Sequence, residues 1–316
     1  LDRDAVRLRG ACERTNCCPL GACAITGTGF PIDRQLTSVL LGFSGPTGNT
    51  YGSIATVDYL LESVGAAAVL LAGVGRVVQD LLLWCMAECG YLRLADGFVQ
   101  CSSIMPQKRN PVALEHARAI ASKALGQASA ILLCVHNTPY GDIVDTEDDL
   151  QPLVARMFKD AARAVALVAA AMTDARFDVA ALAARATEGW VTATELADAL
   201  TRDRGVAFMA AHAVVSRFLT DARTLSDRPL TEILRRASRA VLGREIVYTV
   251  AQLEEILSPE HFVAVRTTLG GPAPSETLRA LEASRSLLEH DTAWLASIRA
   301  TLRQAEQQLK NAAEYL

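Results

Sequence analysis

The sequence predicts an all-α protein built from long helices, and three observations lead to that prediction. Aromatic residues make up only 5% of the 316 residues, although aromatic and β-branched side chains are the ones that favour strands. Apolar residues recur at helical spacing over long segments, and alternation of apolar and polar residues is almost absent. A period near 3.6 indicates amphipathic helices, whereas a period of two would indicate strands.

The predicted helices follow one another with turn and cap signals between them. They cover residues 1–14, 52–90, 111–134, 147–172, 179–185, 192–202, 207–226, 230–241, 249–255, 259–268 and 276–315. Gly90 is expected just beyond the end of the second helix, where glycine adopts the left-handed conformation at low cost. We expect Asn110 to be the N-cap and Pro111 the first residue of the third helix, 111–134. Residues 146–149 resemble a capping box whose acids suit the positive helix end.

A change of composition near residues 172–178 predicts a division into two domains. Before it the helices are long and nearly free of charge; after it they are shorter and rich in Arg, Asp and Glu. We expect a central helical bundle domain over 1–172, which contains a polar loop at 101–111, and a helical C-terminal domain over 173–316. The last helix carries a leucine at every seventh position from Leu281 to Leu316. This stripe is expected to pack against a neighbouring helix.

Composition and charge exclude several classes of protein. The chain is 51% hydrophobic, and its 35 acidic and 31 basic side chains give a net charge of -4. This excludes a disordered chain and argues against a nucleic-acid partner, which a basic surface would indicate. The most apolar run, 64–75, is shorter than a membrane span, and the charged start does not resemble a signal peptide. We therefore expect a cytoplasmic protein with no membrane partner.

The cysteines are expected to be reduced thiols without a metal. There are eight, but no Cys-x-x-Cys pair and no zinc-type Cys/His spacing occurs. Cys85 and Cys89 are four residues apart and are expected on one helix face. Because nothing resembles a nucleotide-binding loop or a metal cluster, no cofactor and no metal are expected.

The segment 101–111 carries the clearest chemical signal. It reads Cys-Ser-Ser-Ile-Met-Pro-Gln-Lys-Arg-Asn-Pro, a polar loop that ends at the start of an apolar helix. The free N–H groups and the dipole of a helix start favour an anion, and Lys108 and Arg109 add positive charge there. Hydroxyls, an ammonium and an amide at one helix end suit a reaction that builds negative charge on a carboxylate. The residue types alone leave an ordinary solvated turn as the alternative.

Residues 102–111 resemble the signature loop Ser-Ser-x-Met-Pro-x-Lys-x-Asn-Pro of the fumarase/aspartase superfamily. All the fixed positions are present. Gln at position 107 resembles the pattern of the argininosuccinate lyase branch. Further segments across the chain also resemble that branch: 19–27, 30–34, 41–43, Asn49 with Thr50, 80–81 and 269–271. The resemblance implies an all-α fold with a long-helix bundle of the fumarase/aspartase type and a small helical C-terminal domain. It also implies a homotetramer whose active sites are shared between subunits.

The resemblance implies the elimination of an amine from an N-substituted aspartate, with release of fumarate. Ser102 corresponds to the general base, and Lys108 to the cation that pairs with the carboxylate whose charge grows. Asn110 corresponds to a hydrogen-bond partner of the same carboxylate, and Glu115 to an acidic supporting residue one turn along the helix. Substrate contacts are implied for Ser103, Met105, Gln107 and Asn49.

Several positions depart from the family pattern. Cys101 stands where a glycine is usual, and Gly52, Thr56 and Val57 stand where an acid and a Glu-Arg pair are usual. Leu150 stands near the family's second carboxylate-binding lysine. These departures leave the leaving amine open, so ethylenediamine-disuccinate is an alternative substrate to argininosuccinate. An adenylosuccinate-type activity fits Gln107 and the Gly-Gly segment at 270–271 less well.

The family's upstream Thr-His and His-Thr-Gly-Arg-Ser-Arg-Asn-Asp motifs have no counterpart in this sequence. They would lie before Leu1, and the sequence does not begin with Met. We therefore expect either residues upstream of Leu1 or a second chain to complete the site. A non-catalytic or partner-dependent scaffold stays open as the third function.

Overall fold

A computed structural model describes residues 1–143 and 147–314 and confirms the all-α class. Among these residues, strands occur only as two-residue segments in two antiparallel pairs. The chain divides into two compact units. Unit 1 comprises Leu1–Phe177 and Arg285–Leu316, and unit 2 comprises Asp178–Ser284.

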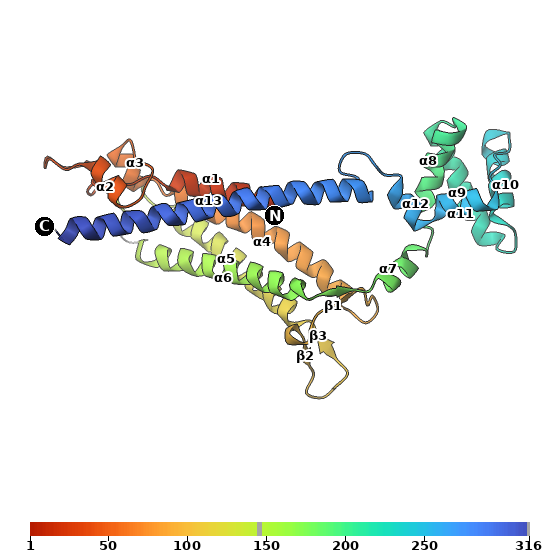
Figure 1. Ribbon diagram of the computed structural model, residues 1–316, viewed down its shortest axis with the longest axis horizontal. Coiled ribbons are helices and arrows are strands. Elements are labelled where there is room, and N and C mark those ends of the chain that lie inside the picture. Colours follow the sequence, from red (N-terminus) through yellow and green to blue (C-terminus); the bar gives the residue numbers. More distant parts are fainter. Residues whose placement is uncertain (144–146, 315–316) are drawn as a thin grey trace. The chain divides into compact units, whose positions relative to one another are not determined.

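Unit 1 is built around three long helices, α4 (Asp58–Trp84), α5 (Val112–His136) and α6 (Glu147–Thr173), which run alongside one another (Figure 1). Alanines dominate the α5 and α6 contact faces, among them Ala124, Ala128 and Ala164, which are at most 1% exposed. Small side chains let two helices approach closely, and leucines and valines of α4 fill the remaining space. The buried core therefore runs along the whole bundle.

The remaining elements of unit 1 surround this bundle. They are α1 (Asp2–Thr15), α2 (Arg34–Leu40), α3 (Thr50–Ala55), β1 (Leu92–Arg93), the 3-10 turn η1 (Asp96–Phe98), β2 (Gln100–Cys101), β3 (Arg109–Asn110) and β4 (Arg176–Phe177). Strand β1 pairs with β4, and β2 pairs with β3.

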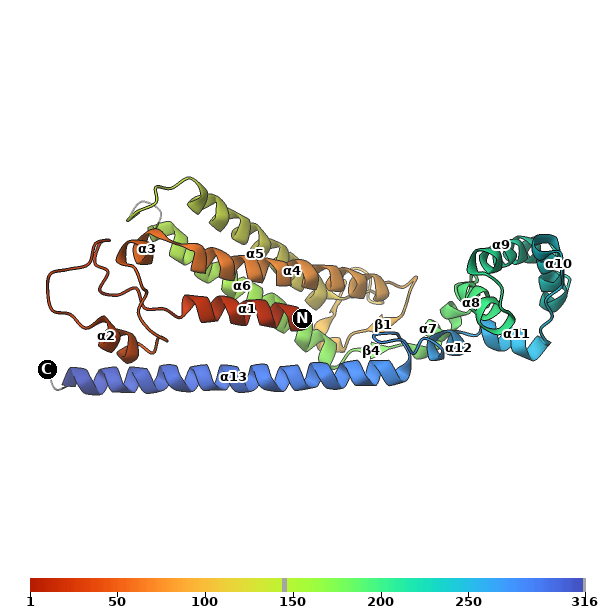
Figure 2. The ribbon, with the colours of Figure 1, turned by 90° about the horizontal axis from the view of Figure 1, so that it is seen from above.

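Helix α13 (Pro274–Glu314) contributes its residues from Arg285 onward to unit 1, where Figure 2 shows it alongside α1. Only part of the leucine stripe contacts unit 1: Leu302 lies beside Gly42. Leu288 is 66% exposed and Leu309 39%, whereas Ala305, from the second stripe, is buried next to Gly42. The guanidinium of Arg9 also lies 5.1 Å from the ring centre of Trp294. The stripe thus meets a neighbouring helix at Leu302, which lines one cavity with Leu8 of α1, and Leu316 lies outside the described residues.

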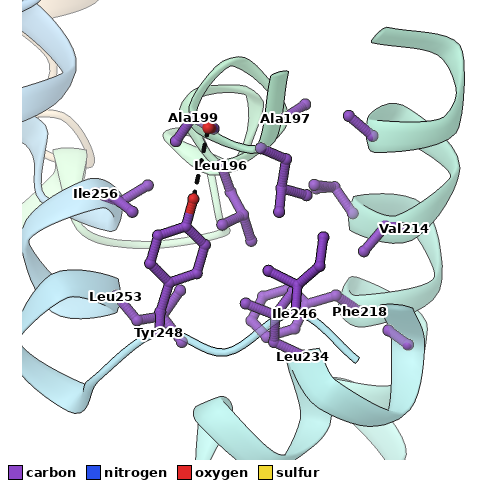
Figure 3. Packing of buried hydrophobic residues seen from close by; sticks show 14 of the residues in the cluster. Leu196, Ala197, Ala199, Val214, Phe218, Leu234, Ile246, Tyr248, Leu253 and Ile256 are labelled. Carbon is purple, nitrogen blue, oxygen red and sulfur yellow. Dashed lines mark hydrogen bonds between the residues drawn. The ribbon is translucent and has the colours of Figure 1, made fainter. Parts of the chain in front are cut away.

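Unit 2 consists of short helices around a core of its own. They are α7 (Val179–Ala186), α8 (Ala193–Arg204), α9 (Phe208–Thr224), α10 (Leu230–Leu242), α11 (Val250–Leu257) and α12 (Pro259–Ala264), followed by the first turns of α13. Figure 3 shows Leu196, Phe218 and Leu234, each 0% exposed, within this core. Tyr248 also points inward, and its hydroxyl donates to the Ala199 carbonyl oxygen at 3.4 Å.

The domain division predicted after Met172 differs from these compact units. The units divide after Phe177, because β4 pairs with β1 and so holds residues 176–177 to unit 1. The later part of α13 packs with unit 1, although it lies far along the chain.

Two local predictions are wrong: the single helix over 52–90, and the helix face expected for Cys85 and Cys89. Residues 52–90 do not form one helix: α3 ends at Ala55, α4 ends at Trp84, and Cys85 and Cys89 follow in turns. The first break lies at Thr56, whose backbone is extended and whose N–H and hydroxyl both donate to the Gly52 carbonyl, the hydroxyl at 2.6 Å. Helix α2 was not predicted at all. The predicted capping box at 146–149 includes Thr146, which lies outside the described residues.

Helices α4 and α5 are each long and apolar enough to cross a membrane by length and composition. The prediction of no membrane-length segment rested on the uninterrupted apolar run 64–75. It therefore missed α4 and α5, which are apolar on average over 18 residues. Exposed apolar side chains remain on both, such as Val77 (56%) and Leu133 (75%). Surface of this kind marks either a membrane or a protein contact.

Candidate active site in the signature loop

The signature loop is the turn of a small hairpin. Gln100 pairs with Asn110 and Cys101 with Arg109, and residues 102–108 connect the two strands. Asn110 is therefore extended and is not the N-cap that the sequence predicts. Pro111 precedes the first helical residue of α5 and provides no side-chain cap.

Ser102 accepts two backbone hydrogen bonds. The N–H groups of Ile104 and Met105 each donate to its Oγ at 3.2 Å. The Lys108 N–H donates to the Met105 carbonyl at 3.0 Å and closes the next turn of the loop. Two N–H donors aimed at one oxygen stabilise negative charge on it, and this lowers the cost of ionising the hydroxyl.

A cleft of about 660 Å³ lies beside the loop, between the end of α4 and the start of α5. Five of the predicted site residues line it: Met105, Gln107, Lys108, Asn110 and Glu115. Ser102 and Ser103 belong to the same loop but are not among the lining residues.

Of the three cations that line the cleft, Arg109 is paired with a carboxylate, whereas Lys108 and Arg118 are not. Arg109 donates to Asp96 Oδ1 at 2.6 Å, and this hydrogen bond lowers the pKa of Asp96 below its usual range. Arg118 donates to Gln79 at 2.9 Å. The ammonium of Lys108, in contrast, has no hydrogen-bond or ion-pair partner within the described part of the chain. It is therefore available to an anion.

Cys101 does not strain the loop, although a glycine is usual at this place in the family pattern. Its backbone is extended by pairing with Arg109 and is not among the positive-φ residues. Cys85 lines the cleft, and burial raises the pKa of its thiol, which keeps it protonated and unreactive.

Asn49 is not brought to this cleft. Its Oδ1 accepts the Gly52 N–H at 2.8 Å and so caps α3, just before α4 begins. The 27 residues of α4 separate it from the signature loop, a length of about 40 Å. Figure 1 shows α3 and the β2–β3 hairpin at opposite ends of the bundle.

Sequence reasoning missed several residues of the site. Asp96 fixes Arg109, and Gln79 fixes Arg118, but both partners come from separate segments without a motif. Only the folded arrangement of α4, η1 and α5 brings them together. No group of His, Cys, Asp or Glu within 1–143 and 147–314 is arranged to hold a metal ion.

Two families match separate parts of the chain. The family described as "Lyase" matches residues 1–126, and the family described as "Argininosuccinate lyase C-terminal" matches residues 190–264. The chain belongs to the fumarase/aspartase superfamily of lyases and is argininosuccinate lyase-like. The apolar helices α4 and α5 are accordingly core helices of this lyase fold.

Curated relatives support the same lyase branch. "Argininosuccinate lyase 2" of Agrobacterium fabrum is 38% identical over 291 residues, which is 91% of this chain and 58% of that protein. "Argininosuccinate lyase" of Methanoculleus marisnigri is 36% identical over 98% of this chain and 62% of its own length. The chain thus spans about three fifths of the length of these relatives.

A solved structure shares the fold over nearly the whole of this chain. The structure of an EDDS lyase variant with bound fumarate has a TM-score of 0.86 and 28% sequence identity, and it covers 99% of this chain and 63% of that one. The predicted fold type is therefore confirmed.

Proposed function

We propose that this protein is a carbon–nitrogen lyase that cleaves an N-substituted aspartate into fumarate and an amine, argininosuccinate being the prototype. The observation that carries the proposal is the Ser102 hydroxyl with two N–H groups directed at its oxygen. The loop lies within residues 1–126, which match the lyase family, and this supports placing the reaction there.

Ser102 acts as the base in this proposal. Its ionised Oγ takes a proton from the carbon next to a carboxylate of the succinyl group. The electrons of that C–H bond form the double bond of fumarate, and those of the C–N bond leave with the amine nitrogen, which takes up a proton. The N–H groups of Ile104 and Met105 stabilise the ionised serine between turnovers.

Lys108 and Asn110 stabilise the charge that grows on the adjacent carboxylate. Both line the same cleft, and the ammonium of Lys108 is available for an anion. Glu115, on the first turn of α5, supports them. Ser103, Met105, Gln107 and Asn49 are assigned substrate contacts. The loop, with Ile104 86% exposed, closes over the substrate during turnover.

The active site is shared between copies of the chain. Asn49 and Ser102 lie at opposite ends of α4, so a substrate that contacts both needs them from different subunits. Exposed apolar side chains on α4 and α5 suit burial in a homotetramer. A cytoplasmic location fits the eight cysteines, all of them free thiols.

A partner-dependent or non-catalytic lyase-like scaffold is the second candidate. It is favoured by the position of Ser102 and Ser103, which do not line the cleft that holds Lys108 and Asn110. In that case a second polypeptide supplies the rest of the site.

The test is consumption of fumarate in the presence of arginine, ethylenediamine, ammonia or AMP in turn. Consumption with one of the amines supports a lyase and names its leaving group, which also separates argininosuccinate from ethylenediamine-disuccinate as the substrate. A folded protein that consumes fumarate with none of them favours the scaffold.

A further inference from the structure

A second pocket lies at the Asn49 end of the bundle. It has a volume of about 260 Å³. Four of its lining residues also line the larger cleft that contains Asn49: Pro19, Ser53, Thr56 and Tyr59. We call the smaller space the Asp142 pocket. The Asp142 pocket adjoins the cleft that contains Asn49. A substrate bound to Asn49 therefore has room for one of its ends in the Asp142 pocket.

The walls of the Asp142 pocket are mainly apolar. Leu60 and Leu150 are each 6% exposed. Val57, Val135 and Ile143 are half-buried and complete the apolar lining. Walls of this kind suit an aliphatic chain, since its burial removes apolar surface from water.

The hydroxyls in the Asp142 pocket already donate to backbone carbonyls. Ser53 donates to Asn49 O at 2.6 Å, Thr56 to Gly52 O at 2.6 Å, and Thr138 to Val135 O at 2.8 Å. Each hydroxyl has a single proton, so these oxygens can only accept a further hydrogen bond. They therefore favour a ligand that donates.

Within the described part of the chain, Asp142 is the one charged residue that lines this pocket, its side chain is exposed, and the lining there includes no lysine or arginine. Its segment is held against α3 by Tyr51, whose hydroxyl donates to Tyr140 O at 3.0 Å and whose ring stacks on that of Tyr140 at 6.1 Å. A carboxylate on the ligand would lie beside Asp142 without a cation to offset the repulsion. An ammonium would instead form an ion pair.

The two ends of the bundle thus have opposite character. The cleft beside the signature loop offers the ammonium of Lys108, which suits the carboxylates of a succinyl group. In the cleft of Asn49, the one basic lining residue, Arg14, is already paired with Glu62.

We propose that the Asp142 pocket binds the leaving amine, and that this amine is a short aliphatic diamine without a carboxylate. The proposal rests on the proposed lyase function and specifies its substrate class. One amino group bears the succinyl group, and the other, as an ammonium, pairs with Asp142. Arginine and an amine bearing a second succinyl group are disfavoured, because their carboxylates would meet Asp142 and acceptor oxygens.

Isothermal titration calorimetry with diaminobutane tests this binding without turnover. Comparison ligands are butylamine, which lacks the second ammonium, and arginine, which adds a carboxylate. We expect the wild-type chain to bind diaminobutane more tightly than either. Asp142→Asn should weaken diaminobutane about two- to fivefold, because Asp142 is exposed. Asp149→Asn, which changes an exposed carboxylate outside the pocket, should leave the affinity unchanged.

Arginine binding as tightly as diaminobutane, or unchanged affinity in Asp142→Asn, overturns the assignment. Fumarate consumption, measured separately, distinguishes the two proposals. If diaminobutane binds through Asp142 but no fumarate is consumed with any amine, the lyase function fails and the pocket assignment stands. If fumarate is consumed with arginine and not with diaminobutane, the function stands and the diamine assignment fails.

Discussion

The buried carboxylate of Glu195 is predicted to hold unit 2 together. Its side chain is 1% exposed, and it accepts from Arg266 at 2.8 Å and from Arg202 at 3.0 Å. Arg266 also donates to Asp198 at 3.3 Å and lies over the Phe262 ring. A single carboxylate therefore links α8 to the segment that precedes α13.

Glu195→Ala removes the anion and leaves two guanidinium groups facing a buried space. Breaking a buried pair costs roughly 3–5 kcal/mol. Arg202 is 48% exposed and returns to water, while Arg266, 24% exposed, keeps other acceptors. We therefore expect the low end of that range, about 3 kcal/mol, which in a unit of this size lowers the Tm by roughly 12–24 °C.

Thermal unfolding and hydrogen exchange of the α8 amides measure the effect, since exchange reports the opening of unit 2 itself. Glu195→Gln separates charge from packing, because it keeps the methylene groups and removes the charge. We expect this variant to show most of the stability loss of Glu195→Ala. Glu245→Ala is the matched control, since its pairing with Arg239 is exposed and worth about 1 kcal/mol or less. A loss below about 1 kcal/mol for Glu195→Ala would refute the reasoning.

Two further predictions concern stability. A Cβ at Gly271 would lie 2.3 Å from the Arg266 carbonyl oxygen and 2.9 Å from that of Thr268, so Gly271→Ala should cost about 1–3 kcal/mol in thermal unfolding. An unchanged Tm would contradict this. The Lys123 ammonium holds the pKa of the Asp160 carboxyl below its usual range, so this pair stabilises the fold above the unfolded pKa of Asp160 and loses its effect as the pH falls. In urea unfolding, Lys123→Met should therefore have a lower free energy of unfolding than the wild type at neutral pH, and the difference should shrink in acid. An equal difference at neutral and acid pH would contradict this prediction.

The long helices could be predicted from the sequence because their apolar residues recur over many turns. The break between α3 and α4 could not, because no Gly or Pro stands at Thr56 or Val57 to signal it. Two-residue strands are too short to show a period, so the hairpin around the signature loop stayed hidden, and with it the extended conformation of Asn110.

The site was predicted only as far as its contiguous motif. Lys108, Asn110 and Glu115 share a cleft because they lie within one loop and one helix turn. Asp96, Gln79 and the Asp142 pocket depend on packing between distant segments, for which no local spacing gives a signal. Asn49 lies in a segment that resembles the family pattern. The structure places it at the opposite end of α4 from the signature loop, and spacing along the sequence does not show this separation.

The most direct test of the central claim is the rate of fumarate formation or consumption in Ser102→Ala beside Ser129→Ala, an exposed serine on α5 that serves as the control. If Ser102 is the base, its variant should lose a factor of about 10²–10⁴ in kcat while KM changes little, because positioned proton transfer contributes that much. The control should keep the wild-type rate. A Ser102→Ala protein that turns over at a rate near that of the control would contradict the account.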